Sequence, residues 1–362
     1  MYAMDATEIL RQWTGTVKEQ LLPSLHGHQA KALAALSLGM VRSGHCDSGR
    51  VALAMPGPAM PASKKRRVER TISNGKVHAD HAQVQLAKAV LTTLANCPGR
   101  PLVLILDETP KGRGLKCLKL SVGYRRRAVP LVWACYPPDD PPVEMPKLIW
   151  RLLRRAARCL PPGAEVILLA DRGLSWPSVL DCCEMLGWHY VLRLLRNVSV
   201  RLPDGTLRQA VELAARRGER WFGTDVEVFK KAGWRKANVV ATWERPCKEP
   251  WLLVTDLPAT FRRCAGYCRR TWCEQMHRDE KSQGFNWQRS LVLEPSRACR
   301  LLLAMALAML LAICTGTWVL KRGLRHVLES TRQRKLSVFQ IGLRWLTGGT
   351  EQPPCTLYLY PT

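Results

Sequence analysis

Two apolar runs, each followed at once by an aspartate, place the strongest constraint on the fold of this 362-residue chain. Residues 102–106 are all aliphatic and lead to Asp107, and the apolar residues 166–170 lead in the same way to Asp171. Continuous apolar runs of this length are typical of strands buried on both faces of a sheet. An acid just past the end of such a strand lies at the carboxyl edge of an α/β sheet, where open sheets bind ligands. The pattern therefore predicts an α/β fold with two carboxylates at one edge of its sheet.

The chain around these runs supplies the other elements of such a core. We predict strands at 115–123 and 128–136, a helix at 143–159, a second helix around 181–186 and a further strand at 188–195. The order strand, strand, strand, helix, strand is that of a ribonuclease-H-like core.

A third acid belongs to a stripe of functional side chains further along the chain. Tyr267, Arg270, Glu274 and Lys281 recur at steps of three, four and seven residues. On an α-helix, at about 100° per residue, these four side chains fall within roughly 60° of one another. Stripes that face a protein core are apolar. This one is instead suited to holding a phosphate backbone around a single carboxylate.

Three motifs together resemble the DDE transposases of bacterial insertion sequences. They are Asp107 in LILDET, Asp171 in LLADRG, and the spacing Y-x-x-R-x-x-x-E-x-x-x-x-x-x-K from Tyr267 to Lys281. The last signature resembles that of insertion-sequence family four and is far more specific than a pair of acids. The similarity continues through KSQGFNWQRS and LSVFQIGLRWL, and weaker similarity covers the basic segment KKRRVERTISNGKVHAD. This resemblance covers most of the chain, and it implies a ribonuclease-H-like core and cut-and-paste DNA transposition.

The resemblance implies that Asp107, Asp171 and Glu274 are catalytic and hold two Mg²⁺ ions, for which Mn²⁺ would substitute. Asp107 would bridge both ions, Asp171 would hold one and Glu274 the other. Such a pair of ions, about 3.5–4 Å apart, supports phosphodiester hydrolysis and transesterification. For any one buried aspartate, a helix cap or a salt bridge is the alternative role, and the set of three favours catalysis. Among competing acids, Glu108 should point away from Asp107, and Asp256 is the strongest rival.

Basic and aromatic side chains near the acids are the predicted DNA contacts. Tyr267 and Lys281 would each lie about 10 Å along a helix from Glu274, which suits flanking phosphates, and Arg270 would lie one turn away. The further predicted contacts are His277, Arg278, Arg172 and the basic run Lys64, Lys65, Arg66 and Arg67. For Arg172, pairing with a surface acid is equally open. For the basic run, a solvated face is the alternative.

The charge balance indicates a nucleic-acid partner. The chain has 55 Lys and Arg residues against 29 Asp and Glu residues, a net charge of +26, and such an excess favours polyanions. The expected partners are the terminal inverted repeats of an element and its target DNA. Synapsis of two ends implies a homodimer. The alternative is a catalytically inactive DNA-binding descendant that acts as a repressor or architectural protein, and the intact set of acids argues against it.

Five segments are expected along the chain. They are a helical, basic DNA-binding region (1–78), the first part of the ribonuclease-H-like core (79–197), a β-rich insertion (198–260), the catalytic helix (261–298) and C-terminal helices (299–362). The insertion carries Trp221, Trp234, Trp243 and Trp251. An exposed tryptophan there could stack on an unpaired base. The alternative is that these side chains form the core of the insertion itself.

Two further features of the chain are expected to be structural. Among 14 cysteines there is no paired C-x-x-C, and Cys264, Cys268, Cys273 and His277 cannot converge on one zinc ion without breaking their helix. Reduced thiols are the better interpretation. Residues 301–320 are uncharged and long enough to span a membrane. Because both flanks are basic and the segment follows the catalytic region, we predict a buried core helix. The expected location is the bacterial cytoplasm, in association with the nucleoid and with no membrane partner.

Overall fold

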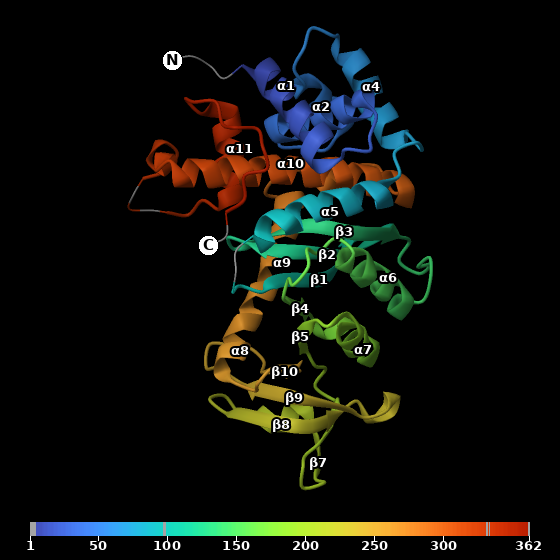
Figure 1. Ribbon diagram of the computed structural model, residues 1–362, viewed down its shortest axis with the longest axis vertical. Coiled ribbons are helices and arrows are strands. Elements are labelled where there is room, and N and C mark those ends of the chain that lie inside the picture. The colour runs from blue at the N-terminus through green and yellow to red at the C-terminus, as the bar shows by residue number, and fades with distance from the viewer. Residues whose placement is uncertain (1–4, 97–98, 331, 333, 361–362) are drawn as a thin grey trace.

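The computed structural model describes residues 5–96, 99–330, 332 and 334–360. One ten-stranded mixed sheet runs along the molecule, and the helices of the first and last parts of the chain gather at one end (Figure 1). The order of strands is β3-β2-β1-β4-β5-β10-β9-β8-β6-β7. The predicted α/β class is therefore confirmed.

The strands agree closely with the apolar pattern of the sequence. They are β1 (Leu102–Lys111), β2 (Leu115–Tyr124), β3 (Arg127–Tyr136), β4 (Val166–Ala170), β5 (His189–Arg193), β6 (Ser199–Arg201), β7 (Leu207–Gln209), β8 (Arg220–Val228), β9 (Arg235–Thr242) and β10 (Trp251–Thr255). The core strands other than β1 lie within two residues of their expected bounds. β1 is longer than expected, because its hairpin with β2 continues past the apolar run.

This longer β1 corrects the expected place of Asp107, which is inside the strand and not after its end. The antiparallel ladder with β2 continues to the last residue of β1, with Asp107 opposite Lys119. The parallel ladder with β4, by contrast, stops at the pair Leu106 and Ala170. Asp107 therefore lies beyond the end of the parallel ladder only. Asp171, which follows β4, is its neighbour at that edge.

The segment 198–260 is rich in strands, and it extends the same sheet. β10 pairs antiparallel with β5, and β9, β8, β6 and β7 follow outward in that order. Its four tryptophans are all partly buried. Trp251 packs edge-on against Tyr267, and the indole of Trp243 donates a hydrogen bond to the carbonyl of Cys247. These two tryptophans therefore contribute to local packing.

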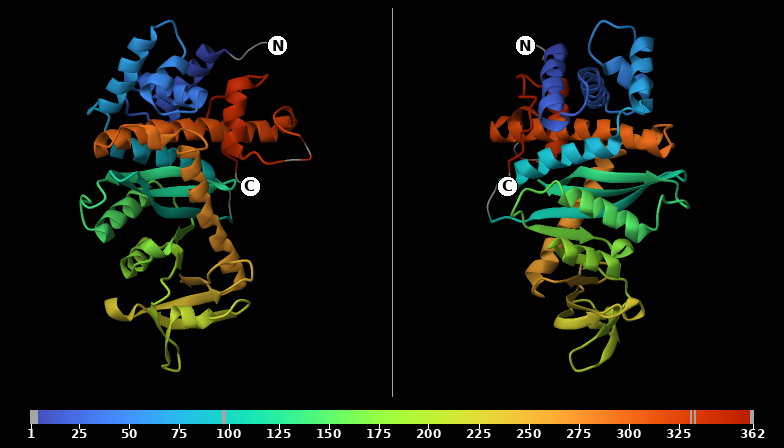
Figure 2. Two further views of the ribbon diagram at one scale, coloured as in Figure 1. Left: turned by 180° about the vertical axis from the view of Figure 1, so that it is seen from behind. Right: turned by 45° about the vertical axis from the view of Figure 1, so that its right-hand side comes forward.

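The helices form a cap at one end and cover both faces of the first strands. The α-helices are α1 (Ala6–Thr16), α2 (Gly27–Ser43), α3 (Ser48–Ala54), α4 (Pro61–Ser73), α5 (Ala79–Ala95), α6 (Met145–Ala157), α7 (Pro177–Leu186), α8 (Phe261–Tyr267), α9 (Thr271–Glu280), α10 (Pro295–Lys321) and α11 (Val338–Gly348). The short turns are η1 (Val17–Leu21), η2 (Arg172–Leu174), η3 (Ala210–Ala214), η4 (Lys230–Ala232), η5 (Cys268–Arg270), η6 (Trp287–Arg289) and η7 (Leu324–Val327). α9 crosses one face of β1–β3, and α6 lies on the other (Figures 1 and 2).

The long apolar helix α10 is the centre of the helical cap, as predicted for 301–320. It lies between the N-terminal helices and the sheet (Figure 1), and it packs against α2, α5 and β3. Its length and composition would suit a membrane, but 89% of its apolar stretch is buried inside the protein. It crosses α11 at Gly316 and Gly342, where an added Cβ on Gly342 would come within 1.7 Å of the carbonyl oxygen of Ala312. Glycine is therefore needed for this close crossing.

The segment predicted as one helix from Tyr267 to Lys281 is divided. α8 ends at Tyr267, η5 is a tighter 3-10 turn, and Lys281 lies beyond the end of α9. In a 3-10 turn, side chains three residues apart eclipse one another. This turn therefore directs both Tyr267 and Arg270 to the end of β4, where each makes a polar contact.

Candidate active site

Asp107 and Asp171 lie next to each other where the parallel ladder of β1 and β4 ends. Asp107 is only 9% exposed, because α9 covers this face of the sheet. Asp171 caps the turn η2 and accepts a hydrogen bond of 2.7 Å from the backbone amide of Arg172. The two neighbouring strands thus bring together the two acids that the sequence predicted as a pair.

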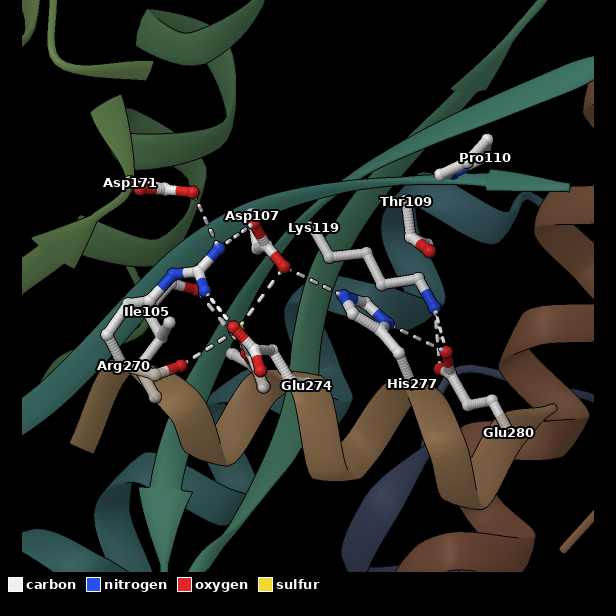
Figure 3. Close-up of polar contacts among 12 residues, drawn as sticks. Ile105, Asp107, Thr109, Pro110, Lys119, Asp171, Arg270, Glu274, His277 and Glu280 are labelled. Carbon is white, nitrogen blue, oxygen red and sulfur yellow. Dashed lines mark hydrogen bonds and ion pairs between the residues drawn. The ribbon is translucent and has the colours of Figure 1, made fainter. Parts of the chain in front are cut away.

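One guanidinium joins these two acids to the third. Nη2 of Arg270 lies 3.0 Å from Oδ1 of Asp107 and 3.2 Å from Oδ2 of Asp171, and Nη1 donates to Oε1 of Glu274 (Figure 3). Arg270 and Glu274 are one helical turn apart, so they reach the acids from the same side of the helix. The three predicted acids therefore converge, although they come from distant segments of the chain.

The charges around Asp107 keep its carboxylate ionised. Burial alone would raise the pKa of Asp107, but the hydrogen bond with His277 and the charge of Arg270 outweigh it and hold that pKa below its ordinary value. For Arg270, burial opposes the charged form, yet the facing carboxylates, Asp107 above all, raise the pKa of the guanidinium. Both partners are therefore charged at neutral pH.

A second set of charged side chains lies deeper under α9. Nδ1 of His277 is 3.2 Å from Oε2 of Glu280, and its Nε2 is 3.2 Å from Oδ2 of Asp107 (Figure 3). Nζ of Lys119 lies 2.6 and 2.5 Å from the two carboxylate oxygens of Glu280. Burial disfavours the ionised form of Glu280, but Lys119 outweighs it and lowers the pKa of Glu280 to about 2. A continuous polar chain thus runs from Lys119 to the predicted catalytic acid.

Asp279, near the end of α9, forms a separate buried pair with Arg127 of β3. Asp279 is fully buried, and its Oδ2 lies 2.8 Å from Nε of Arg127 on β3. Burial raises the pKa of Asp279 to about 7, because the attraction of Arg127 offsets only part of the lost hydration. Asp279 and Glu280 thus hold α9 against the sheet, and neither belongs to the three converging acids.

A hollow of about 350 Å³ opens beside the acids. Its lining includes Asp107, Glu274 and the exposed Arg278. Lys281, also in the lining, donates from Nζ to Oγ1 of Thr109 at 2.7 Å. Two of the predicted DNA-contacting residues, Arg278 and Lys281, therefore lie at an opening next to the acids.

Three other predicted DNA contacts are occupied within the protein. Tyr267 is 4% exposed, and its hydroxyl donates to the carbonyl of Ala170 at 3.1 Å. His277 is buried between two carboxylates, as described above. Nη1 of Arg172 lies 3.0 Å from Oε2 of Glu249, which is the surface pairing left open by the sequence. Tyr267 therefore faces inward, whereas His277, although buried, also borders the hollow.

The basic run lies on α4, at the end of the molecule opposite β6–β9 (Figures 1 and 2). Lys64 donates to the carbonyl of Met55 at 2.8 Å, so its position is fixed by the preceding turn. Lys65 is exposed, 3.9 Å from Glu69, and Arg66 and Arg67 are exposed. The exposed members of the run are therefore available on the surface of a helix.

The rival acids have structural partners. Glu108 accepts from the hydroxyl of Tyr136 and lies 3.0 Å from Nζ of Lys116. Asp256 lies 2.6 Å from Nδ1 of His189 and accepts from the backbone amide of Tyr190 at 2.9 Å. These contacts are of the kind expected for a strand-end salt bridge or cap.

Sequence reasoning missed two residues of the site, Cys273 and Lys119. The thiol of Cys273 is fully buried and lies 3.2 Å from Oδ2 of Asp107. Burial and the nearby carboxylate raise the pKa of this thiol, so it is protonated and donates. The available signal for Lys119 was a charged residue inside the apolar strand LKCLKLSV. For Cys273, the signal was its spacing of four residues from His277.

The three acids fit a site for hard divalent ions, since they offer only carboxylate oxygens. Oδ1 of Asp107 and Oδ2 of Asp171 lie 3.0 and 3.2 Å from the same nitrogen of Arg270, so they cannot be more than about 6 Å apart. This separation suits two metal ions spaced about 3.5–4 Å apart. The guanidinium of Arg270 lies among them, so ion binding requires that it move. No protein-family model matches the chain, and no curated protein matches it either.

Proposed function

We propose that this chain is a DDE transposase that cuts transposon ends and joins them to target DNA. The observation that carries the proposal is the convergence of Asp107, Asp171 and Glu274 on one guanidinium. The sheet also supports a ribonuclease-H-like core, because three antiparallel strands are followed by a helix and a strand parallel to the first. The Tyr267-to-Lys281 signature supports insertion-sequence family four.

The three acids would hold two Mg²⁺ or Mn²⁺ ions. When bound, such ions supply activation of the attacking hydroxyl and stabilisation of the leaving oxygen. Asp107 and Asp171 contact one nitrogen of Arg270 and Glu274 contacts another, and Asp107 would be the shared ligand. His277 holds the other oxygen of Asp107 and so fixes the orientation of this carboxylate.

Arg270 would exchange its partners during DNA binding. In the protein alone its single positive charge offsets part of the repulsion among the three carboxylates. A phosphate is an equally good bidentate partner for a guanidinium, so Arg270 can pass from the acids to the scissile phosphate. Lys281 and Arg278 line the adjacent hollow and would bind the flanking phosphates.

DNA would contact the protein well beyond the acids. Arg66 and Arg67 are exposed on α4, and the net charge of +26 favours a long polyanion. We expect binding to terminal inverted repeats and to target DNA, with two protomers in the synaptic complex. Such a protein would act in the bacterial cytoplasm at the nucleoid.

One observation favours a second function, that of a DNA-binding descendant without catalysis. Arg270 contacts all three acids, so the cluster is held together by ion pairs without any metal. A repressor or architectural protein could keep such a cluster to hold α9 on the sheet. The two functions differ in whether the protein cuts DNA in the presence of Mg²⁺.

The test is cleavage of DNA that carries the short inverted repeats flanking the reading frame. The full-length protein should nick these ends with Mg²⁺ or Mn²⁺ and join them to a target plasmid. Asp107→Asn, Asp171→Asn and Glu274→Gln should each abolish cleavage and still bind the ends. Glu184→Gln, an exposed acid on α7, is the matched control and should cleave normally. Full cleavage by any variant of the three acids would refute the assignment, and end binding without cutting by the wild type would favour the non-catalytic function.

A further inference from the structure

Three buried side chains of different chemistry meet on the inner side of Asp107. A carboxylate oxygen of Asp107, Sγ of Cys273 and a ring nitrogen of His277 all lie within 4.8 Å of one another. Cys273 and His277 are one turn apart on α9, and each lies 3.2 Å from the same carboxylate oxygen. All three residues are buried. A carboxylate, a thiol and an imidazole thus converge from one strand and one helix.

The second ring nitrogen of His277, Nδ1, has the kind of partner that metal-binding histidines have. Its Nδ1 lies 3.2 Å from Oε2 of Glu280, and Lys119 fixes that carboxylate. Metal-binding histidines almost always donate their second ring N–H to a carboxylate, a carbonyl or a water. If Nδ1 donates to Glu280, the lone pair of Nε2 faces the carboxylate of Asp107, which is also an acceptor. A divalent ion bound between Nε2 and Oδ2 would accept a lone pair from each of them.

We propose that Asp107, Cys273 and His277 form a site for a borderline-soft divalent ion of the Zn²⁺ class, distinct from the pair of hard ions at the three acids. Zn²⁺ and Co²⁺ take thiolate, imidazole and carboxylate ligands together, whereas Mg²⁺ prefers oxygen ligands only. Three protein ligands leave a fourth position of a tetrahedron for water. Binding releases the thiol proton, because the thiolate is the ligand.

This set differs from the four residues that the sequence excluded as a zinc site. Cys268 is exposed on the turn η5 and is not part of the buried cluster. Asp107, which comes from a strand, completes the pair Cys273 and His277 instead. The helix therefore does not need to break for the site to form.

The two kinds of ion would compete through Asp107. Its Oδ1 faces Arg270 and the other acids, and its Oδ2 faces Cys273 and His277. An ion of the Zn²⁺ class on Oδ2 would draw the carboxylate toward α9 and weaken its hold on Mg²⁺. Inhibition of DNA cleavage by low Zn²⁺ rests on the proposed function, whereas binding of the ion does not.

The test of binding uses Co²⁺ as a spectroscopic probe of the full-length, metal-free protein. One equivalent of Co²⁺ should produce thiolate-to-cobalt charge-transfer absorption, which Zn²⁺ removes and excess Mg²⁺ does not. Cys273→Ser should lose this absorption and weaken binding more than about tenfold. Cys268→Ser, an exposed cysteine five residues earlier, is the matched control and should keep it. Absence of the absorption in the wild type, or its persistence in Cys273→Ser, would overturn the proposal.

A second measurement needs no variant and covers the case in which Cys273→Ser does not fold. X-ray absorption of the Zn²⁺-loaded wild type should show one sulfur at about 2.3 Å and nitrogen or oxygen ligands at about 2.0–2.2 Å. The competing cluster is that of Cys117, Cys135 and Cys299, whose first two sulfurs are 3.6 Å apart. A shell of two or three sulfurs would assign the ion there and overturn the proposal. Cobalt binding without any DNA cleavage would remove the proposed function alone, and cleavage without cobalt binding would remove only this inference.

Discussion

The two halves of the inner face of α9 handle charge in different ways. In the first half, Arg270, the residue before α9, faces three carboxylates. The side chains of Asp171 and Glu274 are 34% and 46% exposed, whereas those of Arg270 and Asp107 are 13% and 12% exposed. In the second half, the side chains of Lys119 and Glu280 are 1% and 2% exposed. The first cluster borders a hollow, whereas the second has no access to solvent.

This difference in exposure determines which ion pairs can change partners and which stay fixed. An ion pair in contact with water contributes about 0–1 kcal/mol, because hydration replaces most of what the partner provides. Removing one partner of a buried pair costs about 3–5 kcal/mol, because the remaining charge has no hydration. Asp171 and Glu274, the more exposed partners, can therefore release Arg270 at low cost, and only its pair with the buried Asp107 needs a ligand as a replacement. The Lys119 half keeps the helix in register on the sheet.

Lys119→Met should have the largest effect on stability. It leaves Glu280 buried without its cation, so we expect a loss of about 3–5 kcal/mol in the free energy of unfolding, measured by urea denaturation. Lys116→Met is the control on the same strand: its side chain is 36% exposed and pairs with Glu108, and it should cost less than about 1 kcal/mol. Adding Glu280→Leu to Lys119→Met should recover part of the loss. Equal effects of the two lysine variants would remove the distinction between the halves.

Arg270→Met tests whether the first half is built to exchange its cation. Without the guanidinium, three carboxylates repel one another, so the metal-free protein should unfold at a lower temperature. Mg²⁺ should then bind at least about tenfold more tightly than in the wild type, which adds about 1.4 kcal/mol of ligand-dependent stability. Thermal unfolding at several Mg²⁺ concentrations measures this. Arg208→Met, an exposed arginine on β7 at the far edge of the sheet, should leave the response to Mg²⁺ unchanged. If Mg²⁺ stabilises all three proteins equally, Arg270 does not compete with the ion.

The pH dependence of stability should distinguish Asp279 from its neighbour Glu280. Burial raises the pKa of Asp279 from 3.8 to about 7, so the folded state binds this proton more tightly than the unfolded state. The contribution of Asp279 is therefore favourable at low pH and is lost as the pH rises from about 4 to about 7, by on the order of 2–4 kcal/mol. The pKa of Glu280 is lowered to about 2, so its contribution changes only below its ordinary value of 4.5 and is constant in this range.

Asp279→Asn should remove this decline, as measured by urea denaturation at pH values between 4.5 and 7.5. Asp140→Asn, an exposed acid, should retain the wild-type slope. A wild-type slope that persists in Asp279→Asn would show that another group titrates in this range.

The sequence predicted the position of the acids because buried parallel strands have a simple pattern. The runs that end at Asp107 and Asp171 are apolar at every position, since both faces of β1 and β4 are covered. Parallel pairing of two such strands brings the residues after them together. A helical spacing then predicted that Arg270 and Glu274 share a face, which requires no knowledge of the fold.

The deeper half of the site was not predictable in the same way. Lys119 lies in a strand whose alternation also suits a solvent-exposed lysine, and its partner Glu280 is 161 residues away in the chain. Only the placement of α9 on this face shows that the two meet. The 3-10 turn η5 has no breaker residue to indicate it, and the inward position of Tyr267 depends on that turn.

Tyr267→Phe should have the smallest effect, and it tests how far the exchanging half extends. The hydroxyl donates to the carbonyl of Ala170, the residue before Asp171. Its loss removes one hydrogen bond to a buried carbonyl and should cost about 1 kcal/mol in urea denaturation. DNA affinity and its dependence on salt should not change, because no phosphate contact is lost. Lys281→Met, at the rim of the hollow, should instead lower DNA affinity and reduce the salt dependence by about one phosphate contact. Tyr267→Phe could instead weaken DNA binding as Lys281→Met does in mobility-shift titrations and retain full stability. That result would show that the phenol turns outward to DNA and is not held by the carbonyl of Ala170.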